Sequence, residues 1–259
     1  MKGRARLALL SLLLAVTVIY DVVAYWGDDI RDAFDSRPAL TILFIGNSRT
    51  YENNMPRMLR EIADSAGNRQ RYAITMHAIG GVSFEDHWNN AEVHALLGHK
   101  WDYVVFQGRS NEQITANANA SFLEYGGKLI ELAKLNHSVP VLFVTWRYAD
   151  ADNTYFYFPA FKHEMHDLIQ ANYLKLANAT GAQVVNVGKA WADIERQSPG
   201  FSLYKDTNHP SVYGSYLSAL MIYEHFSGDD LARVTFVPKG ISPKDADFLK
   251  LIAQKERFY

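Results

Sequence analysis

Short apolar runs alternate with longer stretches of helical periodicity along most of this chain. The runs are rich in Val, Ile and Phe and are apolar on both faces, which is typical of strands buried in a parallel sheet. They lie at Ile42–Ile45, Tyr72–Ile79, Tyr103–Phe106, Val141–Thr145 and Gln183–Val187. The periodic stretches between them are Met55–Ala66, Phe84–Leu97, Ala118–Leu135 and Ala160–Ala177. This alternation predicts an α/β fold: a single doubly wound domain whose five-stranded, mostly parallel sheet has helices on both faces.

Two further helices are expected after the last strand. One runs from Ser211 through Phe226, and an amphipathic one begins near Ser242. Residues 41–259 would form the folded domain, and the polar residues 27–40 would link it to the N-terminal segment. In such a domain the C-terminal ends of the strands share one edge of the sheet, where ligands bind.

The first 26 residues have the layout of an export signal. Basic residues at positions 2, 4 and 6 precede an uncharged run from Leu7 to Tyr20, and a second apolar stretch ends at Trp26. We expect residues 1–26 to be a signal peptide or an N-terminal membrane anchor, with the rest of the chain exported to the periplasm or the extracellular space. A buried N-terminal helix is the alternative. Membrane contact is expected only through this segment.

Composition narrows the possible functions. The formal net charge is −2 and no basic cluster follows residue 6, so we expect no nucleic-acid partner. The chain has no cysteine, which excludes a thiolate nucleophile, disulfides and Cys-based metal sites. His163 and His166 are three residues apart, which does not match the H-E-x-x-H zinc motif, and we interpret them as part of a solvated helix face. Neither a metal nor another cofactor is expected, and the oligomeric state stays open.

Polar residues follow each of the first three strands, and an aromatic and basic group follows the fourth. Each group also has an ordinary interpretation: a helix cap, a tight glycine turn, a polar loop or a packed rim. The groups are Gly46-Asn47-Ser48, Gly80-Gly81-Val82-Ser83, Gln107-Gly108-Arg109-Ser110-Asn111 and Trp146-Arg147-Tyr148.

A histidine with an acidic partner comes late in the chain, just before the helix that begins at Ser211. His209 precedes a proline, which favours an extended backbone, and Asp206 lies three residues before it. The carboxylate can accept the Nδ1 proton and leave Nε2 free as a base. Since a serine hydroxyl needs such a base to react at neutral pH, Ser48 and His209 are a candidate nucleophile and base.

These motifs, in this order over residues 41–226, resemble the SGNH (GDSL-type) hydrolases. The first block of that family usually reads G-D-S and here contains Asn47, and the last block, D-x-x-H, is matched by Asp206 and His209. The third block departs from the common G-x-N-D. It is similar to the Q-G-E-S-N block of the carbohydrate acetylesterases, with Arg109 in place of the glutamate. The motifs are also similar to those of an uncharacterised bacterial SGNH-like branch.

The resemblance implies a flavodoxin-like SGNH fold and a role for each motif. Ser48 would be the nucleophile, His209 the base and later the acid, and Asp206 the residue that orients it. The backbone N–H groups of Ser48 and Gly81, with the side chain of either Asn111 or Gln107, would bind the oxyanion. Residues expected to contact the substrate are Asn47, Arg109, Trp146 and Arg147.

We therefore expect an esterase that removes short acyl groups, such as acetyl, from a small-molecule or carbohydrate ester. An O-acyltransferase with the same triad and a non-catalytic binding protein of the same fold are the alternatives.

Overall fold

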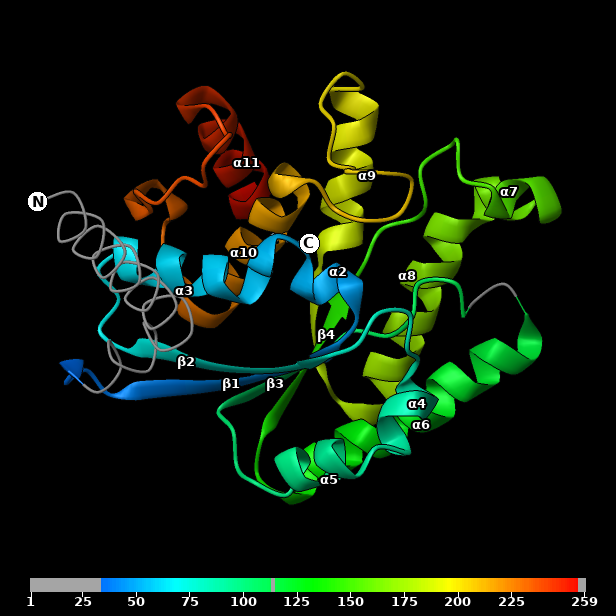
Figure 1. Cartoon of the computed structure of the whole chain (residues 1–259), viewed down its shortest axis with the longest axis horizontal. Helices are drawn as coiled ribbons and strands as arrows, with labels where there is room; N and C mark the ends of the chain where they lie inside the picture. Colours follow the sequence, from blue (N-terminus) through cyan, green and yellow to red (C-terminus); the bar gives the residue numbers. More distant parts are fainter. Residues whose placement is uncertain (1–33, 113–114, 256–259) are drawn as a thin grey trace, which may run out of the picture.

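The computed structural model describes residues 34–112 and 115–255, which form one twisted sheet with helices on both faces (Figure 1). Its strands are β1 (Ala39–Gly46), β2 (Arg71–Ala78), β3 (Tyr103–Phe106), β4 (Val139–Val144) and β5 (Gln183–Asn186). All neighbouring strands pair in parallel, in the order β2-β1-β3-β4-β5. The predicted fold class is confirmed.

The helices connect the strands and complete the chain after β5. They are α2 (Ser48–Tyr51), η1 (Glu52–Asn54), α3 (Met55–Ser65), α4 (Phe84–Trp88), α5 (Ala91–Leu97), α6 (Ala116–Leu135), α7 (Thr154–Tyr157), α8 (Phe161–Thr180), α9 (Val187–Gln197), α10 (Val212–Ser227), η2 (Leu231–Arg233) and α11 (Pro243–Lys255).

Alternate residues of each strand serve two separate cores, because successive side chains point to opposite faces of a sheet. Ile42 and Phe44 of β1 belong to the core under α3, α9, α10 and α11. Leu43 and Ile45 belong to the core under α4, α5, α6 and α8. The central strands are therefore buried on both sides, as their continuous apolar runs predicted.

Two predicted elements differ from the structure. The predicted helix Phe84–Leu97 is two helices, because the Asn90 side chain accepts a hydrogen bond from the backbone N–H of Glu92 and starts α5 afresh. The predicted strand through Val187 ends one residue earlier. There the Asn186 side chain accepts from the N–H of Lys189 and caps α9, a helix that the sequence analysis missed.

The predicted N-terminal signal or anchor, residues 1–26, lies outside the described residues. Within residues 34–112 and 115–255, no helix combines the length and the apolar character needed to cross a membrane. The predicted linker, residues 27–40, extends slightly too far, since β1 already begins at Ala39.

Strand order determines where the loops meet. The chain leaves β1 to add β2 on one side, and β3 then pairs with the other side of β1. Ligands of open parallel sheets bind at this kind of reversal, beyond the C-terminal ends of the strands. The loops after β1 and β3 are joined there, because the N–H of Asn47 donates to Oε1 of Gln107 at 3.0 Å.

Candidate active site

The turn after β1 presents Ser48 at the C-terminal edge of the sheet. A Cβ atom on Gly46 would collide with the side chain of Thr50, so this turn requires glycine. Asn47 is the N-cap of α2, and its side chain accepts from the N–H of Arg49 at 3.2 Å. The interpretation of Ser48 as a helix cap is therefore wrong: Asn47 caps the helix, and the Ser48 hydroxyl has another partner.

That partner is His209. The distance between Ser48 Oγ and His209 Nε2 is 3.0 Å, and His209 Nδ1 lies 2.9 Å from Oδ2 of Asp206. A carboxylate can only accept, so Nδ1 carries the proton and Nε2 is free to accept from the serine hydroxyl. The structure thus brings together the three residues that the sequence analysis singled out.

Asp206 is fixed by its own loop. Its Oδ1 accepts the backbone N–H groups of Asn208 at 2.8 Å and His209 at 2.7 Å. Partial burial acts to raise the pKa of Asp206, but these hydrogen bonds and that from the His209 ring lower it to about 2. The carboxylate is therefore charged at neutral pH and holds the imidazole in one tautomer.

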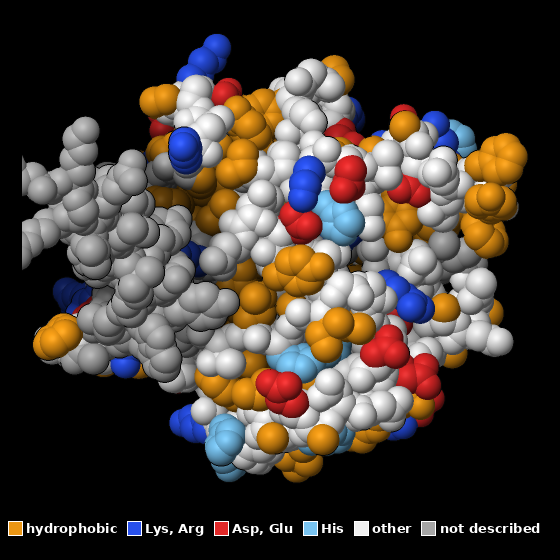
Figure 2. Space-filling view, viewed as in Figure 1, with side chains coloured by type: hydrophobic (Ala, Val, Ile, Leu, Met, Phe, Trp, Pro, Cys, Tyr) orange, Lys and Arg blue, Asp and Glu red, His pale blue; other side chains and the backbone are white. Residues whose placement is uncertain are grey.

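The site is open to solvent. Side-chain exposure is 29% for His209 and 50% for Asp206. Charged and histidine side chains gather near α2 on the face seen in Figure 2. Lys205 and Glu52 form an ion pair of 3.0 Å, which joins the loop of His209 to the segment after Ser48.

Two backbone donors of the predicted oxyanion site are unoccupied. Within residues 34–112 and 115–255, the N–H groups of Ser48 and Gly81 donate to no acceptor. Gly81 has a φ of +74°, a conformation that favours glycine. Free N–H groups in two neighbouring turns are the groups that an oxyanion would need.

The two candidate amide side chains differ in their surroundings. Gln107 is buried, its Oε1 accepts from the N–H of Asn47 and lies 3.0 Å from Thr50 Oγ1, and its Nε2 donates to the carbonyl of Gly108. The Oε1 end thus holds the Ser48 turn, and the Nε2 end is engaged by the backbone of the loop after β3, so Gln107 supports the site from within the protein. The Oδ1 of Asn111 is buried without a hydrogen bond among the described residues. An amide oxygen can only accept, so the group that could bind an oxyanion is the Nδ2 of Asn111, which donates to no acceptor among the described residues.

The predicted substrate contacts of Asn47 and Arg109 have a structural explanation instead. Asn47 is 4% exposed, and its Nδ2 donates to the carbonyls of Val82 at 3.3 Å and Gly108 at 3.4 Å. It ties the turns after β1, β2 and β3 together. The backbone N–H of Arg109 donates to Oε2 of Glu112 at 2.9 Å, and its Nε is buried without an acceptor among the described residues.

Trp146 and Arg147 follow β4 as expected, but their side chains have partners within the protein. Trp146 is 1% exposed and stacks on Trp191 with ring centroids 3.7 Å apart, so it belongs to the core. Arg147 pairs with Asp150 at 2.6 Å and Glu195 at 3.4 Å. The Trp146 ring is therefore not accessible to a substrate, and the charge of Arg147 is balanced by two carboxylates.

The exposed aromatic side chains of this region lie further along the same loop. Phe156, Tyr157 and Phe158, which the sequence analysis did not single out, are 80%, 73% and 46% exposed, and Figure 2 shows hydrophobic side chains gathered over α7. Their loop is bonded to the loop of His209, because the Thr207 hydroxyl donates to Oδ2 of Asp152 at 2.6 Å. The run of four aromatic residues from Tyr155 to Phe158 was the signal that could have identified them.

Arg49 and Asn208 were also missed. The Arg49 guanidinium donates to Oδ1 of Asn208 from Nε at 3.0 Å and from Nη2 at 2.7 Å. Their positions in the sequence could have identified them, because Arg49 directly follows Ser48 and Asn208 directly precedes His209.

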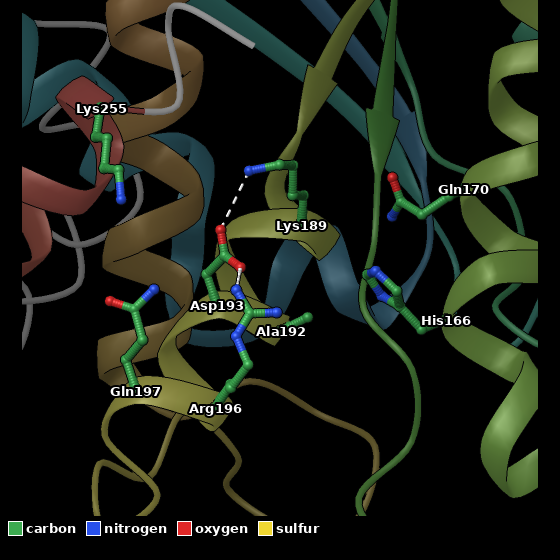
Figure 3. Close-up of a pocket in the computed structure, with 8 residues that line it drawn as sticks. All are labelled: His166, Gln170, Lys189, Ala192, Asp193, Arg196, Gln197 and Lys255. Atoms are coloured by element: carbon green, nitrogen blue, oxygen red, sulfur yellow. Dashed lines mark hydrogen bonds and ion pairs between the residues drawn. The ribbon is translucent and has the colours of Figure 1, made fainter.

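A separate cavity lies among α8, α9 and α11, away from this arrangement (Figure 3). It measures about 510 Å³, and none of Ser48, Asp206 and His209 lines it. Its cations are largely neutralised within the cavity, since Lys189 and Arg196 both pair with Asp193. His166 points into it, and the described residues contain no group of three side chains that could hold a metal ion.

The sequence matches no protein-family model and no curated protein. Solved structures do match. A DUF4886 family protein from Bacteroides uniformis is 21% identical with a TM-score of 0.70, over 85% of this chain and 95% of that one. A candidate SGNH hydrolase from Slackia heliotrinireducens is 28% identical with a TM-score of 0.62, over 73% and 100% of the two chains.

A third similar structure is an acetyl xylan esterase, AlAXEase, at 16% identity and a TM-score of 0.59, over 71% of this chain and 98% of that chain. The chain is thus similar in its fold to proteins of the SGNH/GDSL superfamily, which confirms the resemblance found in its sequence.

Proposed function

We propose that this protein is a serine esterase of the SGNH type, which removes short acyl groups from a polar substrate such as a carbohydrate ester. The observation that carries the proposal is the continuous hydrogen-bonded arrangement from Ser48 through His209 to Asp206. A serine hydroxyl that lies 3.0 Å from an imidazole oriented by a carboxylate has the geometry of an activated nucleophile.

In the proposed reaction, Ser48 Oγ attacks the ester carbonyl carbon while His209 Nε2 takes the hydroxyl proton. Asp206 stabilises the imidazolium that forms. The tetrahedral intermediate then collapses: the bond to the leaving alcohol breaks, and His209 gives its proton to that oxygen. Water attacks the acyl-enzyme by the same steps, releases the acid and restores the serine.

The negative charge of the intermediate needs preorganised donors. The free N–H groups of Ser48 and Gly81 supply two, and Nδ2 of the Asn111 side chain supplies the third in this proposal. Gln107 supports them indirectly, since its amide holds the turn in which the N–H of Ser48 lies. Such donors stabilise the transition state more than the ground state.

The choice of a short acyl group and a polar alcohol rests on two observations. The half-exposed His209 and Asp206 lie on an open surface, which suits a polar substrate better than a long alkyl chain. The structural similarity to an acetyl xylan esterase points in the same direction. We also propose that the chain is exported, and held or guided by residues 1–26, because of their charge and apolar pattern.

Hydrolysis of p-nitrophenyl acetate, butyrate and octanoate by the full-length chain tests the proposal, with Ser48→Ala as the control. We expect Ser48-dependent turnover that decreases as the acyl chain lengthens. Equal, slow turnover by both proteins would contradict catalysis by Ser48 and favour a binding protein. Acetylated xylan and a free sugar acceptor in the same assay distinguish hydrolysis, which releases acetate, from transfer to the sugar.

A further inference from the structure

A buried arginine follows Ser48 directly in the chain. The side chain of Arg49 is 2% exposed, although α2 begins only one residue earlier. No carboxylate of the described residues forms an ion pair with it. Removing a guanidinium from water without a counter-ion is unfavourable, so its hydrogen bonds and ring contacts must compensate for the lost hydration.

All the polar partners of Arg49 belong to the loops that surround the candidate triad. Two of its nitrogens donate to the same oxygen, Oδ1 of Asn208, and Nη1 donates to the backbone carbonyl of Trp146. The guanidinium carbon lies 4.8 Å from the ring centre of Trp146 and 5.3 Å from that of Tyr148. A planar, delocalised cation suits this combination of forked donors and stacked rings.

Asn208 is held at three points. Its side chain accepts from Arg49, its N–H donates to Asp206 at 2.8 Å, and its carbonyl accepts from Nε1 of Trp146 at 3.1 Å. It lies between the acid and the base of the candidate triad. A shift of Asn208 would therefore also shift Asp206, to which its N–H is bonded, or His209, which follows it in the chain.

We propose that Arg49 is a positioning residue, which holds the Asp206–His209 loop at the correct distance from Ser48 through Asn208. The inference rests on the proposed esterase function. Because Arg49 is buried, it does not contact the substrate. It links the nucleophile's own helix to the loop of the base, so that the two move together as one rigid unit.

Arg49→Lys and Asn208→Ala in the full-length chain test this role. Lysine keeps the charge but cannot supply the fixed fork that reaches both Asn208 and the Trp146 carbonyl. We expect kcat for p-nitrophenyl acetate to fall about 10- to 100-fold in each variant, because small misplacements of reacting groups cost about that much. KM should change less than about threefold, and the double variant should lose no more than the worse single variant.

A matched control is Arg60→Lys, the same substitution at an arginine that is 6% exposed on α3. It should lower thermal stability and leave kcat within about twofold of the wild type. If Arg49→Lys lowers stability in the same way and leaves kcat unchanged, its role is structural and the proposal is overturned.

A second readout does not depend on turnover. The proton on Nδ1 of His209 should give a low-field NMR resonance, assigned by its loss in His209→Gln. It should persist in the wild type and in Arg60→Lys, and broaden or disappear in Arg49→Lys and Asn208→Ala. Persistence in Arg49→Lys would overturn the positioning role. A wild type with the resonance but without Ser48-dependent hydrolysis would instead contradict the esterase function.

Discussion

Ser48 and His209 are separated by 161 positions in the chain, yet their side chains meet at 3.0 Å. Contacts beside them explain how the fold maintains this distance. The side chain of Asn53 donates to the carbonyl of Pro210 at 3.0 Å and to the hydroxyl of Ser215 at 2.9 Å. The segment after the serine is thus bonded directly to the start of α10, the helix that follows the histidine.

Replacement of Ser48 by alanine should abolish hydrolysis and leave the fold intact. We expect kcat to fall by about 10⁴- to 10⁶-fold, because the nucleophile is lost and only binding and oxyanion stabilisation remain. The free energy of unfolding should change by less than about 1 kcal/mol, since only one hydroxyl is removed at the edge of the core. Steady-state kinetics and urea unfolding measure the two quantities.

Alanine substitutions of Asn111 and Gln107 should have contrasting effects. Asn111→Ala should lower kcat about 10²- to 10³-fold at nearly unchanged stability, the usual cost of one oxyanion donor. Gln107→Ala should lower the free energy of unfolding, because the N–H of Asn47 loses its buried partner at a cost of about 1–3 kcal/mol. A stable Gln107→Ala with the larger kinetic loss would reverse our assignment of the donor.

The hydrogen bonds of Asp206 predict a stability difference that disappears in acid. The pKa of Asp206 is lowered to about 2 in the folded protein, against about 3.9 in an unfolded chain. Its contribution is therefore fully present above about pH 4 and is lost as the pH falls through about 2. Urea unfolding of the wild type and Asp206→Asn should show a difference at pH 5 that narrows toward pH 2. A difference that stays constant over this range would contradict the lowered pKa.

The buried carboxyl group of Glu112 predicts the opposite pH dependence, in which folding stability falls as the pH rises. Its side chain is 1% exposed, and burial raises its pKa to about 8 in spite of the nearby positive charge and N–H of Arg109. The folded state therefore keeps a proton that the unfolded chain loses above about pH 4.3, so folding becomes less favourable as the pH rises to about 8. Relative to Glu112→Gln, wild-type stability should fall by at most about 1.4 kcal/mol per pH unit. Parallel pH profiles of the two proteins would contradict this.

The sequence was sufficient to predict the features that depend on local pattern. Continuous apolar runs identified all five strands, and the spacing of Asp206 and His209 predicted their contact, because three residues of loop suffice to bring the two side chains together. Ser83 and Asp86, which are also three residues apart, form a capping box at the start of α4.

The sequence did not allow us to predict whether an individual side chain is buried or exposed, or which partner it contacts. Trp146 follows a strand as an exposed aromatic would, but Trp191, 45 positions later, provides a stacking surface that draws it inward. The two amides after β3 look equivalent in sequence, and only the close approach of the turn after β1 engages Gln107. Arg49 escaped notice because a charged residue beside a loop is ordinarily solvated, whereas here Asn208 and two aromatic rings enclose it.

The pairing of β1 has one further consequence. This strand is hydrogen-bonded on both sides, with Gly46 opposite Ala78 of β2 and Ile45 opposite Phe106 of β3. A slip of one residue would exchange its two apolar faces between the cores and also carry Ser48 to the wrong height above the sheet. A molecule that folds with β1 misaligned would therefore lack activity and would have poorly packed cores. Its exposed apolar surface would distinguish it from the native protein.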